Sequence, residues 1–294
     1  MNQLLVVTNE VAGGTGDERV EAALAMLREA TEVRREECSR PGDLDRVLDG
    51  LGERTLVVMG GDGSVHTAVE TLHRRGELSP DRPLGLVPLG TGNDLARTLG
   101  IPLDPTEAAR ALLTGRPRRL DLVVDDAGGV VVNAVHLGVG AEAAAKASAL
   151  KDRLGTAAYA VGSVAAGVRA AGWRLRVEVD GSPALVDREV LMVAVANGRT
   201  IGGGALLAPD ALPDDGLVDV VVATSTGPLA RLGFAVALRG GEHVERDDVT
   251  VVRGRTVTVS GDPFPLNADG ELAGPVSART WTVRPASWAL VVPS

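Results

Sequence analysis

A glycine-rich turn with an aspartate inside it is the segment whose residue types best suit phosphate binding. It reads Gly60-Gly61-Asp62-Gly63-Ser64 and stands between an apolar run and a helical pattern. Glycines let the backbone turn sharply and approach a phosphate closely, and the N–H groups at a helix start point toward the anion. Asp62 would repel that phosphate unless a divalent cation lay between them. On these residues alone, a tight turn with Asp62 as the N-cap explains the pattern equally well.

A second glycine-rich segment follows the next predicted strand. Leu84–Pro88 leads into Leu89-Gly90-Thr91-Gly92-Asn93-Asp94, where a hydroxyl, an amide and a carboxylate accompany the glycines. Loops that follow neighbouring parallel strands converge at the carboxyl edge of the sheet. We therefore expect the two loops to contribute to one ligand site.

Two acidic segments stand in the second half of the sequence. Between Ala208 and Asp219 four aspartates crowd around Pro and Gly, and such crowding suggests oxygen ligands for a hard cation. By itself, however, this segment is better explained as a solvated loop before a strand. Asn267-Ala268-Asp269-Gly270-Glu271 is by itself a β-turn, with Glu271 as an ordinary surface residue.

Strand and helix patterns alternate through the first part of the chain. Strands are predicted at Leu4–Val7, Thr55–Met59 and Leu84–Pro88, and helices at Asp17–Ala30, Asp43–Leu51, Ser64–Arg75 and from about Asn93. Such alternation indicates parallel strands joined by crossover helices, so residues 1–125 are predicted to form an α/β nucleotide-binding domain.

The pattern changes after Leu120, where short β-branched segments predominate. Strands are predicted at Val130–Asn133, Arg174–Val179, Leu185–Ala196, Val218–Ala223, Thr256–Ser260 and Ala289–Val292, and helices only at Ala141–Ala171 and Pro228–Arg239. This pattern predicts a β-sandwich domain over residues 126–294, with the return of the last strands to the first domain left open.

Composition excludes several classes of protein. The net charge of -9 argues against a nucleic-acid binder, which needs a basic surface. The single cysteine, Cys38, excludes an intramolecular disulfide and suits a reducing cytoplasm. No signal peptide is expected, and the least polar long stretch, Ala157–Val168, is too short and glycine-rich to span a bilayer of about 30 Å. We expect a cytoplasmic protein that contacts any membrane substrate only transiently.

Taken together, the motifs resemble the diacylglycerol kinase catalytic family, which includes bacterial lipid kinases and the sphingosine kinases. The resemblance extends over nearly the whole chain and rests on Gly60–Ser64, Pro88–Arg97, Asn197-Gly198 with Gly202-Gly203-Gly204, Ala208–Asp219, and Asp269-Gly270-Glu271. It implies an ATP- and Mg²⁺-dependent lipid kinase that transfers the γ-phosphoryl group to a lipid hydroxyl, with diacylglycerol giving phosphatidic acid as the leading case.

The resemblance also implies a set of nucleotide-binding residues. They are Thr8, Asn9, Gly13, Cys38, Gly60, Gly61, Asp62, Gly63, Ser64, Val65, His66, Thr67, Thr91 and Asn93. The sequence departs from the family at Glu10, where Pro is usual, and at Cys38, where a threonine hydroxyl is usual. His66 and Thr67 replace the commoner Asn and Glu, which affects the expected contacts on the substrate side.

Catalytic and metal-binding roles are implied in the same way. Glu271 matches the general base that takes the proton of the attacking hydroxyl, and Asp62 would help to hold the catalytic Mg²⁺. A second, structural Mg²⁺ would be bound by Asp215 and by the carbonyls of Leu212 and Leu217. The active site is expected in a cleft between the two domains.

Two other functions are weighed against the lipid kinase. A kinase of the NAD kinase type shares Gly-Gly-Asp-Gly, but it does not explain Pro88–Arg97 or the Asp215 turn. A non-catalytic nucleotide-binding regulator would not need Asp62, Asp215 and Glu271 together. The lipid is not specified by the sequence, and a homodimer is left open.

Other chemically capable residues receive ordinary roles or a role at the membrane. His73, His136 and His243 lack ligand spacing and are assigned to surface or core, and Trp281 and Trp288 to the core. The basic residues expected to face anionic lipid are Arg116, Arg118, Arg119, Lys151, Arg153, Arg169, Arg174 and Arg176. For the predicted helix Ala141–Ala171, packing over the β-sandwich explains the pattern at least as well.

Overall fold

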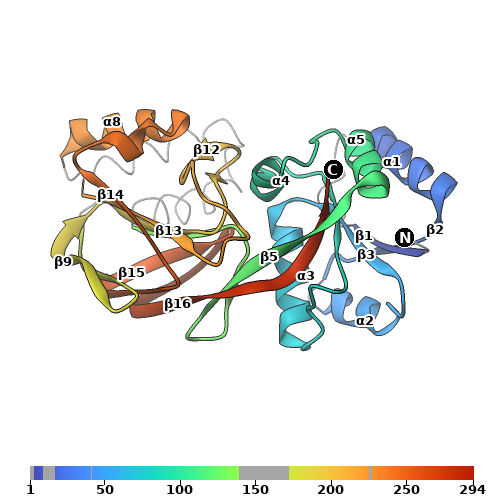
Figure 1. Ribbon diagram of the computed structural model, residues 1–294, viewed down its shortest axis with the longest axis horizontal. Helices are drawn as coiled ribbons and strands as arrows, with labels where there is room; N and C mark the ends of the chain where they lie inside the picture. The colour runs from blue at the N-terminus through green and yellow to red at the C-terminus, as the bar shows by residue number, and fades with distance from the viewer. Residues whose placement is uncertain (1–2, 9–16, 41, 139–171, 225–226) are drawn as a thin grey trace. The chain divides into compact units, whose positions relative to one another are not determined.

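The computed structural model describes residues 3–8, 17–40, 42–138, 172–224 and 227–294 (Figure 1). The chain divides into two compact units. The first comprises residues 1–122, 202–204 and 285–294, and the second comprises residues 123–201 and 205–284. A short internal turn and the C-terminal residues therefore belong to the first unit.

The first unit is built on a parallel sheet, as the alternation of strands and helices predicts. Its strands are β1 (Gln3–Thr8), β2 (Glu32–Glu37), β3 (Thr55–Gly60) and β4 (Gly85–Pro88), in the order β2-β1-β3-β4. Its helices are α1 (Asp17–Ala30), α2 (Asp43–Asp49), α3 (Asp62–Arg74), α4 (Asp94–Leu99) and α5 (Pro105–Thr114). Because all strands run in one direction, β1, β3 and β4 end at the same edge, with Thr8, Gly60 and Pro88 as their last residues.

Strand β2 is the element of this sheet that the sequence does not predict. Its residues, Glu32-Val33-Arg34-Arg35-Glu36-Glu37, show no apolar alternation, and it lies at the edge of the sheet. Its backbone pairs with β1 along its whole length. Its charged side chains pair locally, as in the 2.8 Å contact between Arg35 and Glu21 of α1. An exposed edge strand tolerates such charges, which also discourage pairing with other chains.

The second unit contains a large antiparallel sheet, which confirms the predicted β-sandwich-like class. The described strands follow the order β14-β13-β10-β7-β15-β16-β5-β6, with β8 paired to β15 and β9 paired to β8. They are β5 (Arg116–Asp125), β6 (Val130–Val131), β7 (Ala134–Gly138), β8 (Trp173–Val179), β9 (Ser182–Val190), β10 (Met192–Ala196), β13 (Val218–Ala223), β14 (Val249–Gly254), β15 (Thr256–Ala268) and β16 (Glu271–Val292). The short strands β11 (Thr200–Ile201) and β12 (Ala205–Leu206) pair separately.

Both faces of this sheet are covered by apolar side chains. One cluster includes Val135, Leu137, Phe264 and Trp281. The other includes Ala134, Ala194, Val221 and Phe234, the last from helix α8 (Pro228–Gly240), which is followed by a 3₁₀ turn at Glu242–Glu245. Burial on both faces explains why β10 reads as a continuous apolar run and β13 as an apolar run broken only by the buried Asp219.

Several predicted strands have different bounds in the structure. The run Leu185–Ala196 belongs to two strands, β9 and β10. Of the predicted strand Val130–Asn133 only Val130–Val131 is a strand (β6), and a separate strand, β7, begins at Ala134. Strand β15 continues to Ala268 through two register shifts near Phe264, where prolines make the sequence look irregular. The predicted helix Ala141–Ala171 lies outside the described residues, whereas Pro228–Arg239 is confirmed as α8.

Trp281 and Trp288 are each 1% exposed, as expected of core residues, and Trp288 Nε1 donates to the carbonyl of Asp121 at 3.0 Å. His73 is exposed, and the buried His243 contacts the Leu207 carbonyl at 2.9 Å. Within the part of the chain that the structure describes, no helix has the length and apolar character needed to cross a bilayer.

Candidate active site

The two glycine loops lie directly against each other, which confirms the expected convergence. The N–H of Leu89 donates to the carbonyl of Gly60 at 3.0 Å. A Cβ on Gly61 would lie 3.0 Å from the Cα of Gly90, and one on Gly90 would lie 2.6 Å from the Cα of Gly61. Neither position can hold a side chain unless the loops separate. The two loops therefore present bare backbone to each other, and a phosphate could approach such backbone closely.

Asn93 holds the second loop in shape. Its backbone is left-handed (φ 52°), its side-chain oxygen accepts from Gly90 N at 2.9 Å, and its amide nitrogen donates to Gly90 O at 2.6 Å. These contacts give Asn93 a supporting role in the loop, whereas Thr91, at the exposed tip, is the residue accessible to a ligand.

Asp62 connects the two loops. The N-cap of α3 is Gly61, and Asp62 is the first helical residue, so the interpretation of Asp62 as N-cap is wrong. Its Oδ1 accepts a hydrogen bond of 3.1 Å from the N–H of Leu95, in the first turn of α4. The carboxylate therefore lies between the starts of two helices, where the positive helix ends favour negative charge.

Asp94 is a functional candidate that the sequence analysis missed. It is 6% exposed, and its carboxylate accepts hydrogen bonds from Gly203 N and Gly204 N, both at 2.9 Å. Asp94 therefore fixes the Gly202-Gly203-Gly204 turn beside the second glycine loop. Its place in the Asn93-Asp94 motif was the available signal, but an acidic residue in the first turn of a helix is so common that the position alone does not indicate a role.

The carboxylates of Asp62 and Asp94 approach the same space over Gly92. Their Oδ2 atoms lie 3.0 Å and 3.3 Å from the position that a Cβ on Gly92 would occupy. Two carboxylates facing one space suit a divalent cation that also binds phosphate oxygens, which is how Mg²⁺ is usually held in kinases. Among the residues that the structure describes, no group of three or more acidic, His or Cys side chains is arranged to hold a metal ion.

Replacing Asp94 by alanine should destabilise the first unit by about 3 kcal/mol, because two hydrogen bonds to a buried charge are lost. Urea denaturation of wild type and variant would measure the difference. Asp104→Ala is the matched control, since Asp104 also accepts from two backbone N–H groups, at 3.0 and 3.1 Å, but on an exposed helix start. That control should lose about 1 kcal/mol. Equal losses in the two variants would contradict a special role for Asp94.

Thr8, the last residue of β1, lies beside Cys38, and its hydroxyl is the group of the two that suits a polar ligand. Thr8 is 6% exposed, and its buried hydroxyl has no hydrogen-bond partner among the described residues. The N–H of Cys38 donates to the carbonyl of Thr8 at 2.9 Å. Burial, together with the nearby Asp43 and Glu36, raises the pKa of the Cys38 thiol and keeps it neutral. The other two residues predicted in this region, Asn9 and Gly13, lie outside the described residues.

The residues from the end of β3 into α3 differ in how they are packed. Gly60 must be glycine, because a Cβ there would lie within 2.4 Å of the Ser64 hydroxyl. The side chains of Val65 and His66 are buried, with 2% and 4% exposure, and face the interior. The hydroxyl of Thr67 donates to Gly63 O at 2.8 Å within the helix. These three side chains therefore make contacts within the first unit, and their predicted role in nucleotide binding stays a prediction.

Glu271 follows a turn that is fixed from several sides. Asp269 and Gly270 have positive φ values, 50° and 100°, and Glu271 is the exposed first residue of β16. The Asp269 carboxylate accepts from the N–H groups of Val132, Asn133 and Ala134 at 2.6, 2.9 and 2.9 Å. Asp269 thereby positions the turn, a role that the sequence analysis missed. A general base needs such a fixed support.

The Asp215 turn is already occupied by an arginine. Asp215 accepts from Leu217 N at 3.0 Å and pairs with the guanidinium of Arg253, whose Nε also lies 3.3 Å from the buried Asp219. Burial raises the pKa of Asp219, and Arg253 opposes that shift. Mg²⁺ bound by Asp215, Leu212 and Leu217 does not fit this arrangement unless Arg253 moves. That metal site stays a prediction.

Arg253→Gln should lower the free energy of unfolding by about 2 kcal/mol, because the buried carboxylate of Asp219 loses its ion pair with Arg253. The loss is moderate because the arginine is partly exposed. Added Mg²⁺ should raise the melting temperature of this variant but not that of wild type. Arg176→Gln, which breaks an exposed pair with Glu178 at 2.8 Å, is the control and should be nearly neutral. A Mg²⁺ response of wild type that Asp215→Ala abolishes would instead support the predicted metal.

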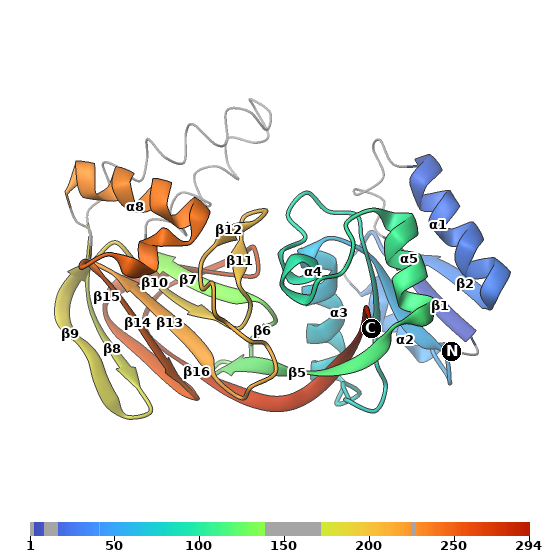
Figure 2. The same cartoon turned by 45° about the horizontal axis from the view of Figure 1, so that its top comes forward.

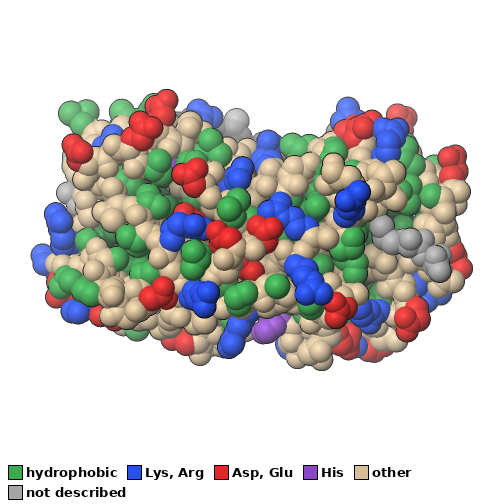
Figure 3. Space-filling view, viewed as in Figure 1, with side chains coloured by type: hydrophobic (Ala, Val, Ile, Leu, Met, Phe, Trp, Pro, Cys, Tyr) green, Lys and Arg blue, Asp and Glu red, His purple; other side chains and the backbone are tan. Residues whose placement is uncertain are grey.

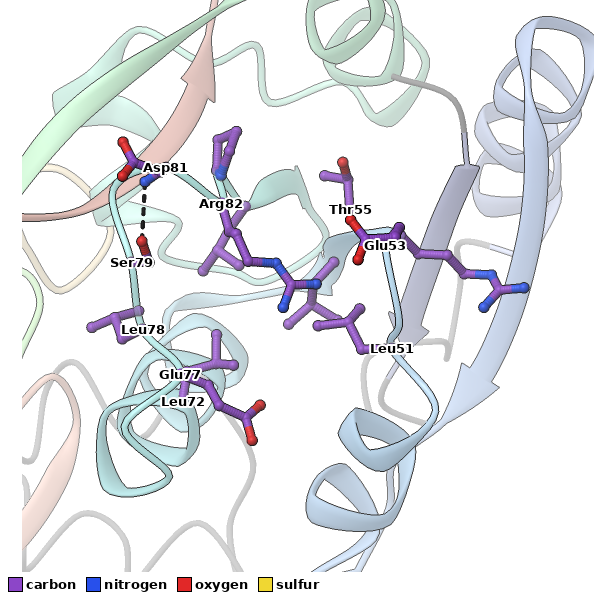
Figure 4. Close-up of a pocket in the computed structure, with 13 residues that line it drawn as sticks. Leu51, Glu53, Thr55, Leu72, Glu77, Leu78, Ser79, Asp81 and Arg82 are labelled. Carbon is purple, nitrogen blue, oxygen red and sulfur yellow. Dashed lines mark hydrogen bonds between the residues drawn. The ribbon is translucent and has the colours of Figure 1, made fainter.

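A pocket of about 190 Å³ lies elsewhere in the first unit (Figure 4). Its lining includes Leu51, Thr55, Leu78, Arg82 and Leu84, at the amino ends of β3 and β4. The glycine loops follow the carboxyl ends of the same strands, so this pocket is not the phosphate site.

The sequence matches known protein families over both halves of the chain. Residues 3–124 match the diacylglycerol kinase catalytic domain, and residues 133–292 match the YegS C-terminal NAD kinase beta sandwich-like domain. A Pseudomonas aeruginosa protein named "Probable lipid kinase YegS-like" is 37% identical over 91% of this chain and 87% of its own length. A Mycobacterium tuberculosis protein named "Diacylglycerol kinase" is 31% identical over 78% of this chain and 74% of its own.

Solved structures share the fold. A crystal structure of a diacylglycerol kinase from Bacillus anthracis aligns with a TM-score of 0.72 and 18% identity, covering 99% of this chain and 96% of the other. Another chain from the same organism reaches a TM-score of 0.77 at 22% identity, covering 99% and 97%. With the paired glycine loops, the two facing carboxylates and the relatives above, this chain belongs to the diacylglycerol kinase/YegS family of lipid kinases.

Proposed function

We propose that this protein transfers the γ-phosphoryl group of ATP to a hydroxyl of a membrane lipid, with diacylglycerol as the first candidate and phosphatidic acid as its product. The observation that supports this most strongly is the pair of contacting glycine loops with Asp62 and Asp94 facing one space over Gly92. The Mycobacterium tuberculosis relative named "Diacylglycerol kinase" suggests the acceptor.

Each group has a distinct task in this reaction. The backbone of the two loops and the starts of α3 and α4 bind the phosphates. Asp62 and Asp94 would hold Mg²⁺, which neutralises charge on the transferred group. The lipid hydroxyl oxygen forms a bond to the γ-phosphorus while the bond to the β-phosphate oxygen breaks and ADP leaves. Glu271 accepts the hydroxyl proton and releases it to solvent. That Glu271 acts with Asp62, from a different unit, stays a prediction.

Labelled ATP offered with a panel of acceptors tests the proposal directly. Diacylglycerol, monoacylglycerol, ceramide and sphingosine would be presented in detergent micelles, and NAD in solution. We expect labelled phosphatidic acid to dominate and its formation to stop when EDTA removes Mg²⁺. Phosphorylation of NAD without any lipid product would support the NAD kinase alternative. ATP binding without turnover on any acceptor would support the non-catalytic regulator.

A further inference from the structure

Helix α8 carries an exposed apolar stripe. Leu229, Leu232 and Val236 are 84%, 46% and 67% exposed, and their spacing of three and four residues places them on one face of the helix. On the opposite side, Phe234 is buried and Leu238 packs against the apolar cluster that covers the sheet. Figure 2 shows α8 lying over that face of the second unit's sheet. The helix is therefore held from one side, and its apolar stripe faces away from the sheet.

Three of the described basic residues that are expected to face a membrane already have partners within the chain. Arg119 lies 3.1 Å from Asp81, Arg176 lies 2.8 Å from Glu178, and Arg174 donates to the Asp187 carbonyl at 3.1 Å. Lys151, Arg153 and Arg169 lie outside the described residues. On the face in Figure 3, basic and acidic side chains are interspersed. Attraction by a basic patch stays a prediction, and apolar contact offers a separate route to the membrane.

The charges on α8 are compatible with an anionic lipid surface. The helix has no acidic residue, although the whole chain carries -9. Its N-cap, Gly227, offers no side-chain oxygen, so the positive helix start lies next to Leu229. Arg239 is exposed in the last turn, followed by the acidic Glu242 and Glu245. The first half of α8 is therefore the part best suited to approach lipid phosphates.

We propose that α8 docks this protein on the bilayer surface, with Leu229, Leu232 and Val236 entering the boundary between headgroups and acyl chains. This inference rests on the proposed function, because a kinase whose acceptor is a membrane lipid must reach that boundary. A second copy of the chain fits the stripe less well. Three side chains spaced over two helical turns fall far short of the roughly 800 Å² per partner that a stable dimer buries. Shallow insertion of a few side chains suits transient binding.

Vesicle flotation without ATP tests the docking independently of catalysis. The vesicles would contain phosphatidylcholine and phosphatidylglycerol in equal amounts. We expect the variant Leu229→Ser/Leu232→Ser/Val236→Ser to partition about tenfold less than wild type, since the transfer of apolar side chains is lost. Val186→Ser is the matched control, because Val186 is 47% exposed on β9 of the same unit. Its partitioning should change by less than about twofold. If the triple variant does not fold, Leu229→Ser alone carries the test.

Kinetics and solution size complete the test. The triple variant should keep its turnover of dihexanoylglycerol in solution and its KM for ATP, and lose turnover only on vesicles. Unchanged vesicle binding would overturn the proposal. A change from dimer to monomer with unchanged vesicle binding would identify α8 as an interface between copies and would also overturn it. Vesicle binding that depends on α8, in a protein that phosphorylates no lipid, would retain the docking and reject the proposed function.

Discussion

Replacing Glu271 by glutamine should lower kcat by about two to four decades and leave ATP binding unchanged. The amide has nearly the same size as the carboxylate but cannot accept the proton of the attacking hydroxyl. The turn should keep its shape, because the hydrogen bonds that fix it come from Asp269 and Asn267 rather than from Glu271. Initial rates at saturating lipid give kcat, and equilibrium binding of a fluorescent ATP analogue gives the affinity.

Glu189→Gln is the matched control for this variant. Glu189 is an exposed glutamate on β9 of the same unit, outside the proposed site, so its replacement should leave kcat unchanged. Asp269→Ala provides a second comparison, because it removes the support of the turn and retains the base. We expect it to lower both kcat and stability. A Glu271→Gln enzyme within a few-fold of wild type would exclude Glu271 as the general base.

Asp62→Asn should lower kcat/KM for ATP by about two decades at fixed Mg²⁺ and raise the Mg²⁺ concentration needed for half-maximal rate. Asparagine retains an oxygen that can accept from the N–H of Leu95, so the contact between the loops survives. The charge that would face the cation is lost. Rates measured over a Mg²⁺ titration at constant ATP separate this effect from a change in folding.

Asp81→Asn controls for the loss of one negative charge from the first unit. Asp81 is exposed, pairs with Arg119 at 3.1 Å, and lines the pocket at the opposite ends of the strands. Its replacement should not change the Mg²⁺ dependence. If Asp62→Asn shows the same Mg²⁺ titration as wild type, Asp62 has only the structural role of joining the two loops.

Much of the fold follows from local sequence patterns. The bounds of β13, Val218–Ala223, and the extent of α8 agree with prediction because both elements are mainly apolar and are flanked by clear turn residues. Strand β2 could not be predicted, because an edge strand can be polar throughout and is defined by its partner β1. The full length of β15, Thr256–Ala268, could not be predicted either, because it too depends on the neighbouring strands. Its prolines and register shifts are tolerated only because neighbouring strands supply the pairing.

The sequence by itself determined where the two glycine loops stand, since glycines and a following helix start are consecutive residues that act through local backbone geometry. It also singled out Glu271, through the resemblance, as the general base to be tested. Only the tertiary structure revealed that Asp94 accepts hydrogen bonds from Gly203 and Gly204, which are 109 and 110 residues away in the sequence. In the same way, Asp269 accepts a hydrogen bond from Ala134, the first residue of β7, at a separation of 135 residues. The tertiary structure also revealed the ion pair between Arg253 and Asp215. These contacts depend on which strands and loops become neighbours, and long-range packing decides this without leaving a periodic signal in the sequence.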